Sequence, residues 1–86
     1  MNNLATQYAY HLKAAREISK GVIGKEKLRA VYLHFAYKAK LPTSKRLYSE
    51  ALEHSAPYDN KSVSKLIRTL AIHAAVYDCT GTNLDC

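Results

Sequence analysis

Residues 60–77 constrain the fold of this chain more than any other segment, because their polarity separates cleanly at the 100° per residue of an α-helix. One side of this expected helix is apolar, with Val63, Leu66, Ile67, Leu70, Ala74 and Tyr77. The opposite side carries the cations Lys61, Lys65 and Arg68. Asn60 is a suitable N-cap for its first turn. The pattern predicts a helix over residues 61–78 that buries one face and turns a basic stripe toward solvent.

The same period predicts three more helices, over residues 3–19, 25–40 and 44–54. Gly21 belongs after the end of the first of these, where a left-handed residue is common. Pro42 separates the second from the third, because the residue before a proline avoids the α region. The connections between the four helices are therefore short.

The first two of these helices show clear core seams. The seams consist of Leu4, Tyr8, Leu12, Ala15 and Ile18, and of Leu28, Val31, Tyr32, Phe35 and Ala39. No segment alternates at period two, so no sheet is expected. The sequence therefore predicts an all-α fold, with one small bundle of four helices over residues 1–79 and an irregular tail over residues 80–86.

The helix over residues 25–40 is unusual because its far side is also apolar. A helix that is apolar nearly all round lies either in a core or at an interface. We expect Leu33, His34 and Tyr37 to form a protein interface. The partner is either a second copy of this chain, giving a homodimer, or another protein.

The 86-residue chain carries a formal net charge of +6, unevenly placed along the sequence. Residues 1–46 hold ten Lys or Arg against two Glu, a balance of +8, whereas residues 47–86 hold three against five acids, a balance of −2. Lys13, Arg16 and Lys20 form a second basic stripe, on the helix over residues 3–19. Such a field attracts anionic partners and speeds their association. Nucleic acid is the first expectation, followed by an acidic protein surface and then an anionic membrane.

No apolar run approaches the ~18–20 residues that cross a bilayer. The N-terminus also lacks the apolar core of a signal peptide, so we expect a cytoplasmic protein that does not span a membrane.

His73, Cys79 and Cys86 match no standard zinc spacing and lack a fourth ligand, so no metal site is expected. A Cys79–Cys86 disulfide is sterically conceivable, but a cytoplasmic setting disfavours it.

Two stretches in the second half form the strongest constellation for recognition. They read Leu41-Pro42-Thr43-Ser44-Lys45-Arg46-Leu47 and Val63-Ser64-Lys65-Leu66-Ile67-Arg68-Thr69-Leu70. Together they resemble the helix-turn-helix of GntR-type bacterial regulators. The chain departs from that family in its longer turn, residues 54–60, and in the absence of a strand-forming segment after the last helix. The resemblance implies a helix-turn-helix-like pair whose second helix reads a DNA groove.

A physical argument independent of the family points to the same residues. Helix N-termini offer free N–H groups and a positive dipole, which suit phosphate. A cation there costs ~0.3–1 kcal/mol unless an anion docks beside it. The expected nucleic-acid contacts are Lys45, Arg46, Lys61, Ser62, Ser64, Lys65 and Arg68, extended along the first helix by Lys13, Arg16 and Lys20.

The alternative is an ordinary pair of helices with a solvated basic face. Glu50 and Glu53 favour this alternative, because they would repel a phosphate backbone that ran along the helix over residues 44–54.

No catalytic arrangement stands out. The run Gly21-Val22-Ile23-Gly24-Lys25 lacks both the spacing and the following Ser or Thr of a Walker loop. Its likeness to the Gly-x-x-Gly clamp of KH domains requires a sheet, which the sequence does not predict. Glu50 and His54 are the one acid–histidine pair at helical spacing, and we expect a surface contact from them. We therefore expect neither an enzyme nor a bound cofactor.

The sequence favours a small DNA-binding protein, such as a regulator from a phage or another mobile element, with DNA docked on the last two helices. The alternative is an adaptor or inhibitor, for example phage-encoded, that docks on an acidic surface of a host or defence machine and has no nucleic-acid role. A helix lying on a membrane surface is a weaker third hypothesis, because the apolar faces are needed for the core.

Overall fold

The computed structural model describes residues 3–54 and 58–82, which form four α-helices. These are α1 (Leu4–Ile18), α2 (Gly24–Leu33), α3 (Ser44–His54) and α4 (Asn60–Thr80), and a π-helical turn, η1 (His34–Lys38), extends α2. No strand occurs in the described residues. The all-α prediction is confirmed, and each helix begins and ends within two residues of its expected bounds when η1 is counted as the end of α2.

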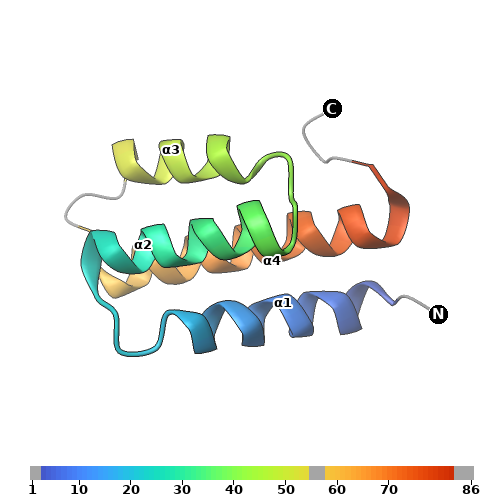
Figure 1. Ribbon diagram of the computed structural model, residues 1–86, viewed down its shortest axis with the longest axis horizontal. Helices are drawn as coiled ribbons and strands as arrows, with labels where there is room; N and C mark the ends of the chain where they lie inside the picture. Colours follow the sequence, from blue (N-terminus) through green and yellow to red (C-terminus); the bar gives the residue numbers. More distant parts are fainter. Residues whose placement is uncertain (1–2, 55–57, 83–86) are drawn as a thin grey trace.

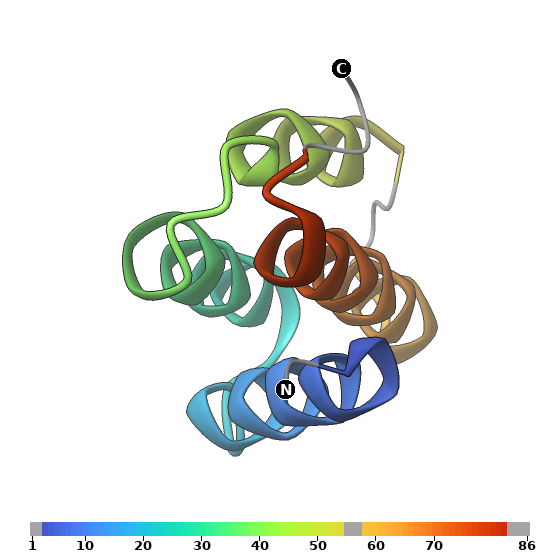
Figure 2. The ribbon, with the colours of Figure 1, turned by 90° about the vertical axis from the view of Figure 1, so that its right-hand side faces the viewer.

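The helices lie roughly along the long axis of the molecule, and successive helices run in opposite directions (Figure 1). Viewed down this axis, α1 and α3 lie on opposite sides, with α2 and α4 between them (Figure 2). One end of the bundle, on the left in Figure 1, therefore holds the ends of α1 and α3 and the starts of α2 and α4. Segments far apart in the sequence meet at this end.

Helix α4 provides the largest share of the core. Its predicted seam is buried at Val63, Leu66, Ile67, Leu70 and Ala74. Phe35 and Leu28 complete the centre from the side of η1 and α2. Small residues, among them Ala15 and Ala71, lie where α1 packs along α4. Their size lets the two backbones approach closely.

The seam expected for α1 is only partly confirmed. Leu4 and Ile18 remain 47% and 49% exposed, respectively. In contrast, His11, Ala15 and Ser19 are buried, at intervals of four residues. The helix thus buries a narrow strip along one flank, and Ile18 lies beside that strip.

Side-chain caps begin two of the helices. The side chain of Asn3 accepts a hydrogen bond from the backbone N–H of Ala5 at 2.8 Å. Asp59 caps α4 by accepting one from the backbone N–H of Ser62 at 2.9 Å. This bond holds the pKa of Asp59 below its usual value. The expected cap, Asn60, is instead the first residue of the helix, because its neighbour Asp59 already has the extended backbone that a cap needs.

Left-handed backbone separates α1 from α2, as the glycines there predict. Gly21 has φ +81° and Gly24 has φ +61°, a region that side chains with a Cβ rarely adopt. The chain turns between them with a hydrogen bond from Val22 N–H to the carbonyl of Ser19, at 3.1 Å. This turn brings the start of α2 back beside the end of α1.

Some predictions fall outside the described residues. These are most of the break at residues 55–59, most of the tail at residues 80–86, and the Cys79–Cys86 disulfide. Within the described ranges, no helix is long and apolar enough to cross a membrane.

Candidate polyanion-binding site

Helices α3 and α4 do not adopt the arrangement that the helix-turn-helix resemblance implies. In that motif a turn of three or four residues joins helices that cross at about 90–120°. Here the two helices lie side by side and run antiparallel (Figures 1 and 2). Helix α4 is also the most buried helix, with seven buried residues. The pair is therefore the antiparallel hairpin that the sequence left open as the alternative.

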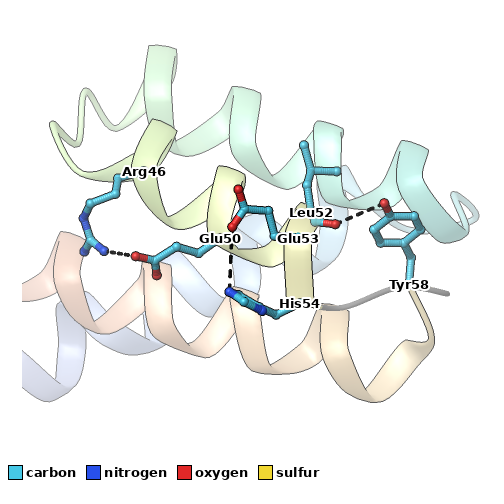
Figure 3. A network of polar contacts seen from close by, with 6 residues as sticks. All are labelled: Arg46, Glu50, Leu52, Glu53, His54 and Tyr58. Atoms are coloured by element: carbon cyan, nitrogen blue, oxygen red, sulfur yellow. Dashed lines mark hydrogen bonds and ion pairs between the residues drawn. The ribbon is translucent and has the colours of Figure 1, made fainter.

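One of the two cations at the start of α3 has an acidic partner on the same helix. Arg46 Nη1 donates a hydrogen bond to Glu50 Oε1, one turn along the same helix (Figure 3). The expected contact between Glu50 and His54 is not seen, since His54 Nε2 lies 3.8 Å from Glu53 Oε2 instead. Glutamates thus offset part of the positive charge along α3, which makes this helix an unfavourable surface for binding a phosphate backbone.

Tyr58, two residues before α4, contacts the end of α3. Its hydroxyl donates a hydrogen bond to the carbonyl of Leu52 at 3.2 Å (Figure 3). Its backbone is left-handed, with φ +63°. This contact ties the end of α3 to the residues just before α4 and so helps to set the position of the first turn of α4.

A pocket of about 320 Å³ opens where α1 ends and where α2 and α4 begin. We call it the basic pocket. Its lining consists of Arg16, Ser19, Lys20, Gly21, Lys27, Ser64 and Ile67. Three of these, Arg16, Lys20 and Ser64, are site residues predicted from the sequence. The antiparallel packing of α1 on α4 brings them together.

The charge in the basic pocket is of one sign. Its lining includes three cations and no carboxylate. Among the described residues, Arg16, Lys20 and Lys27 form no ion pair. Arg16 lies in the last turn of α1 and Lys20 in the turn that follows it, so like charges are close together here. An anion in the pocket would offset this repulsion.

Helix dipoles explain some of these positions but not all of them. Arg16 and Lys20 lie at the C-terminus of α1, where positive charge is favourable. Lys27 lies near the N-terminus of α2, and Lys61 lies in the first turn of α4, where positive charge is unfavourable. The start of α2 also has no side-chain cap. Glu26 in the first turn of α2 and Asp59 at the cap of α4 offset part of this cost.

The two serines of the basic pocket have different roles. Ser19 is 1% exposed, and its hydroxyl donates a hydrogen bond to the carbonyl of Ala15 at 2.7 Å. Ser19 therefore stabilises the C-terminus of α1 and its hydroxyl is already used. Ser64 is exposed on α4, so its hydroxyl is the one that a ligand can reach.

The remaining predicted residues of α4 divide between two surfaces. Lys61, Lys65 and Arg68 are all exposed. Ser62 and Lys65 line a groove of about 290 Å³ between α3 and α4, together with Glu50. Arg68 follows Ser64 by one turn and so lies on the same side of α4 as the basic pocket.

The predicted residue Lys13 is exposed on α1, one turn before Arg16 and Glu17.

Lys27 is the cation of the basic pocket that the sequence reasoning missed. It is half-buried and lies one turn before the core residue Val31. A lysine at the edge of a core seam is a usable signal, because such a side chain must lie along the neighbouring helix. The sequence alone does not say which helix that neighbour is.

The predicted protein interface needs one correction. Leu33 and Tyr37 are exposed, at 36% and 70%, but His34 is only 6% exposed. His34 follows Val31 by three residues, so it lies on the buried flank of the helix rather than on its outer side. The outer face of α2 and η1 therefore presents Leu33 and Tyr37 without the histidine.

A second polar cluster lies at the opposite end of the bundle. His11 Nε2 lies 2.7 Å from Asp78 Oδ2, which joins α1 to the last turns of α4. His34 and Lys38 line a cavity of about 220 Å³ with this pair. Within the described residues, no group of three or more His, Cys, Asp or Glu could hold a metal ion. This cluster therefore connects helices, and the basic pocket is the better candidate for a ligand.

Comparisons of the chain with protein families, with curated proteins and with solved structures find no match. The functional argument therefore depends on the residues themselves.

Proposed function

We propose that this protein binds nucleic acid, DNA in particular, through a basic surface formed by α1, the start of α2 and the start of α4. The observation that carries the proposal is the basic pocket, where unpaired cations from α1 and α2 meet an exposed hydroxyl from α4. The surrounding exposed cations extend this surface, namely Lys13, Lys61 and Arg68.

The proposal differs from the mode that the sequence favours. Groove reading needs a recognition helix that stands clear of the fold, but α4 packs against the other three helices and has seven buried residues. Phosphate contacts need only cations and N–H or O–H donors at the surface, and they carry no sequence information. The surface described here therefore supports contacts to the backbone of DNA rather than insertion of α4 into a groove.

The test is binding to a random-sequence DNA duplex, measured by fluorescence anisotropy at two salt concentrations. We expect micromolar binding at low salt, with a slope of log K against log salt of about −0.9 for each phosphate neutralised. Lys20→Glu with Lys27→Glu places two negative charges in the basic pocket and lowers the net charge from +6 to +2. This double variant should lose most of the binding.

A matched control separates the pocket from the total charge. Arg29→Glu with Lys38→Glu also lowers the net charge to +2, but neither residue lines the basic pocket. We expect this control to keep more of the affinity than the pocket variant, with circular dichroism confirming that both are folded. Equal losses in the two variants, or no binding at low salt, would overturn the proposal.

The exposed apolar face of α2 and η1 supports a second candidate, an adaptor or inhibitor that docks on another protein. Tyr37 is 70% exposed and Leu33 lies one turn before it. Aromatic residues of this kind dominate many protein interfaces. In this case Leu33→Ala with Tyr37→Ala would abolish partner binding, while the double variant in the basic pocket would have little effect.

A further inference from the structure

The basic pocket differs from the α3–α4 groove and from the cavity at the opposite end of the bundle because its charged side chains are all positive. The α3–α4 groove has Glu50 in its lining, and the cavity at the opposite end of the bundle has Asp78. Arg16, Lys20 and Lys27 line the basic pocket without any carboxylate. Its chemistry therefore selects against neutral and cationic ligands and favours a compact anion of high charge.

The donors of the pocket come from more than one direction. Arg16 lies in the last turn of α1, Lys20 in the turn that follows it, Lys27 on α2 and Ser64 on α4. A phosphate monoester matches this arrangement, because it has three terminal oxygens and carries about −1.5 to −2 charges at neutral pH. An internal phosphodiester has two free oxygens and a single charge, so it would leave part of the donor set unused.

We infer that the basic pocket binds the terminal phosphate monoester of a nucleic-acid strand in preference to an internal phosphodiester. This inference rests on the proposed function and adds an end preference to it. The lining of the pocket comes from α1, the turn after it, α2 and α4. The exposed cations Lys61 and Arg68 lie on the same helix as Ser64, where they contact the internal phosphates that follow the end.

The test compares short single strands of one sequence that carry a fluorophore at one end and either a phosphate or a hydroxyl at the other. Phosphates at the 5′ and at the 3′ end are tested separately, because the two ends share the same monoester chemistry. A terminal phosphate adds up to two charges, so the control strand has a terminal hydroxyl and two more nucleotides. We expect at least one of the phosphorylated strands to bind about fivefold more tightly than this control, as an additional unit charge near a cation predicts.

Variants in the pocket identify where the end binds. Lys27→Gln removes one cation from the lining, and Ser64→Ala removes the reachable hydroxyl without a change in charge. Both should reduce the difference between phosphorylated and hydroxyl strands. Lys25→Gln is the matched control, because Lys25 is exposed on the same helix and does not line the pocket. It should leave the difference unchanged.

The possible failures are distinguishable. Salt-dependent binding without any preference for a phosphorylated end would overturn this inference and leave the proposed function standing. If neither these strands nor the DNA duplex binds at low salt, the proposed function fails, and inorganic phosphate then tests the pocket alone by NMR titration. Chemical-shift changes that Lys27→Gln abolishes would support a phosphate site, and their absence from the unmodified protein would overturn it.

Discussion

His34 is the residue at which a change of pH should act most directly. Its ring is buried, and neither Nδ1 nor Nε2 has a hydrogen-bond partner. Burial is the main cause that lowers the pKa of His34, and the neighbouring charges of His11 and Lys38 lower it further. The other polar groups that share its cavity are Tyr10 and Asp78. The folded protein therefore favours the neutral form of the ring.

We expect the free energy of unfolding to decrease as the pH falls from 7.5 to 5.5. In the unfolded chain His34 takes its ordinary pKa of 6.5, so below that pH the unfolded state binds more protons than the folded state. The loss continues until the pH reaches the lower pKa of the folded ring. His73 acts in the same direction, since burial and Arg46 lower its pKa as well.

Urea denaturation at several pH values measures this dependence. His34→Gln, which cannot be protonated, should reduce the loss of stability between pH 7.5 and 5.5. His54→Gln is the control, because the His54 side chain is exposed on α3. An unchanged pH dependence in His34→Gln would show that the buried ring is not responsible.

At the scale of elements, α4 is the helix on which the rest of the fold packs. Leu70, near the middle of α4, is fully buried, whereas Ile72, two residues later, is 43% exposed. We expect Leu70→Ala to lower the free energy of unfolding by about 2–5 kcal/mol, through lost burial and a cavity. Ile72→Ala should cost about 0.5 kcal/mol. Urea unfolding of both variants checks this, and similar losses would contradict a central position for α4.

Helix α3 provides the test between the two modes of DNA binding. Lys45→Glu with Arg46→Glu lowers the net charge to +2, as the double variant in the basic pocket does. A helix-turn-helix mode predicts that this change abolishes DNA binding. We expect a smaller loss of affinity than from Lys20→Glu with Lys27→Glu, measured by anisotropy at one salt concentration. The variant also breaks the exposed pair between Arg46 and Glu50, at a cost of about 0.3–0.5 kcal/mol in stability.

The elements themselves could be predicted because each helix carries its own periodic signal. Val63, Leu66 and Leu70 identify a buried face without any knowledge of what covers it. Glycine and proline mark the breaks through backbone sterics, which are equally local. These features depend only on residues that are close in the sequence, so a single sequence is enough to predict them.

The candidate site could be predicted only in part, because it depends on how the flanks of different helices meet. The periodicity identifies Arg16 and Ser64 as candidates but does not place them together. Lys27 has a place in the site because α2 begins beside α1 and α4, and His34 is buried beside His11 of α1 and Asp78 of α4. The likeness to a helix-turn-helix rests on residue types at helix starts, which do not fix the direction in which one helix crosses another.

The fold brings cations from separate parts of the sequence together at one end of the protein. Four cations of the first half, Arg16, Lys20, Lys25 and Lys27, and the basic start of α4 lie at one end of the bundle, where α1 ends and α2 and α4 begin. An 86-residue domain buries a modest share of its surface, so its stability is small in absolute terms. A ligand that relieves the repulsion at this end should therefore have a measurable effect on the stability of the whole protein.

We expect the melting temperature to rise when DNA is added at low salt. At a free DNA concentration ten times Kd, binding to the folded state alone adds about 1.4 kcal/mol, which corresponds to about 5–10 °C for a domain of this size. Differential scanning fluorimetry or circular dichroism measures the shift. High salt should abolish the shift, because the counterions that binding releases are then already concentrated in solution. Lys20→Glu with Lys27→Glu should show little shift even at low salt. A shift that persists in this variant would place the DNA on another surface, and a fall in melting temperature would mean that DNA binds the unfolded chain more tightly than the bundle.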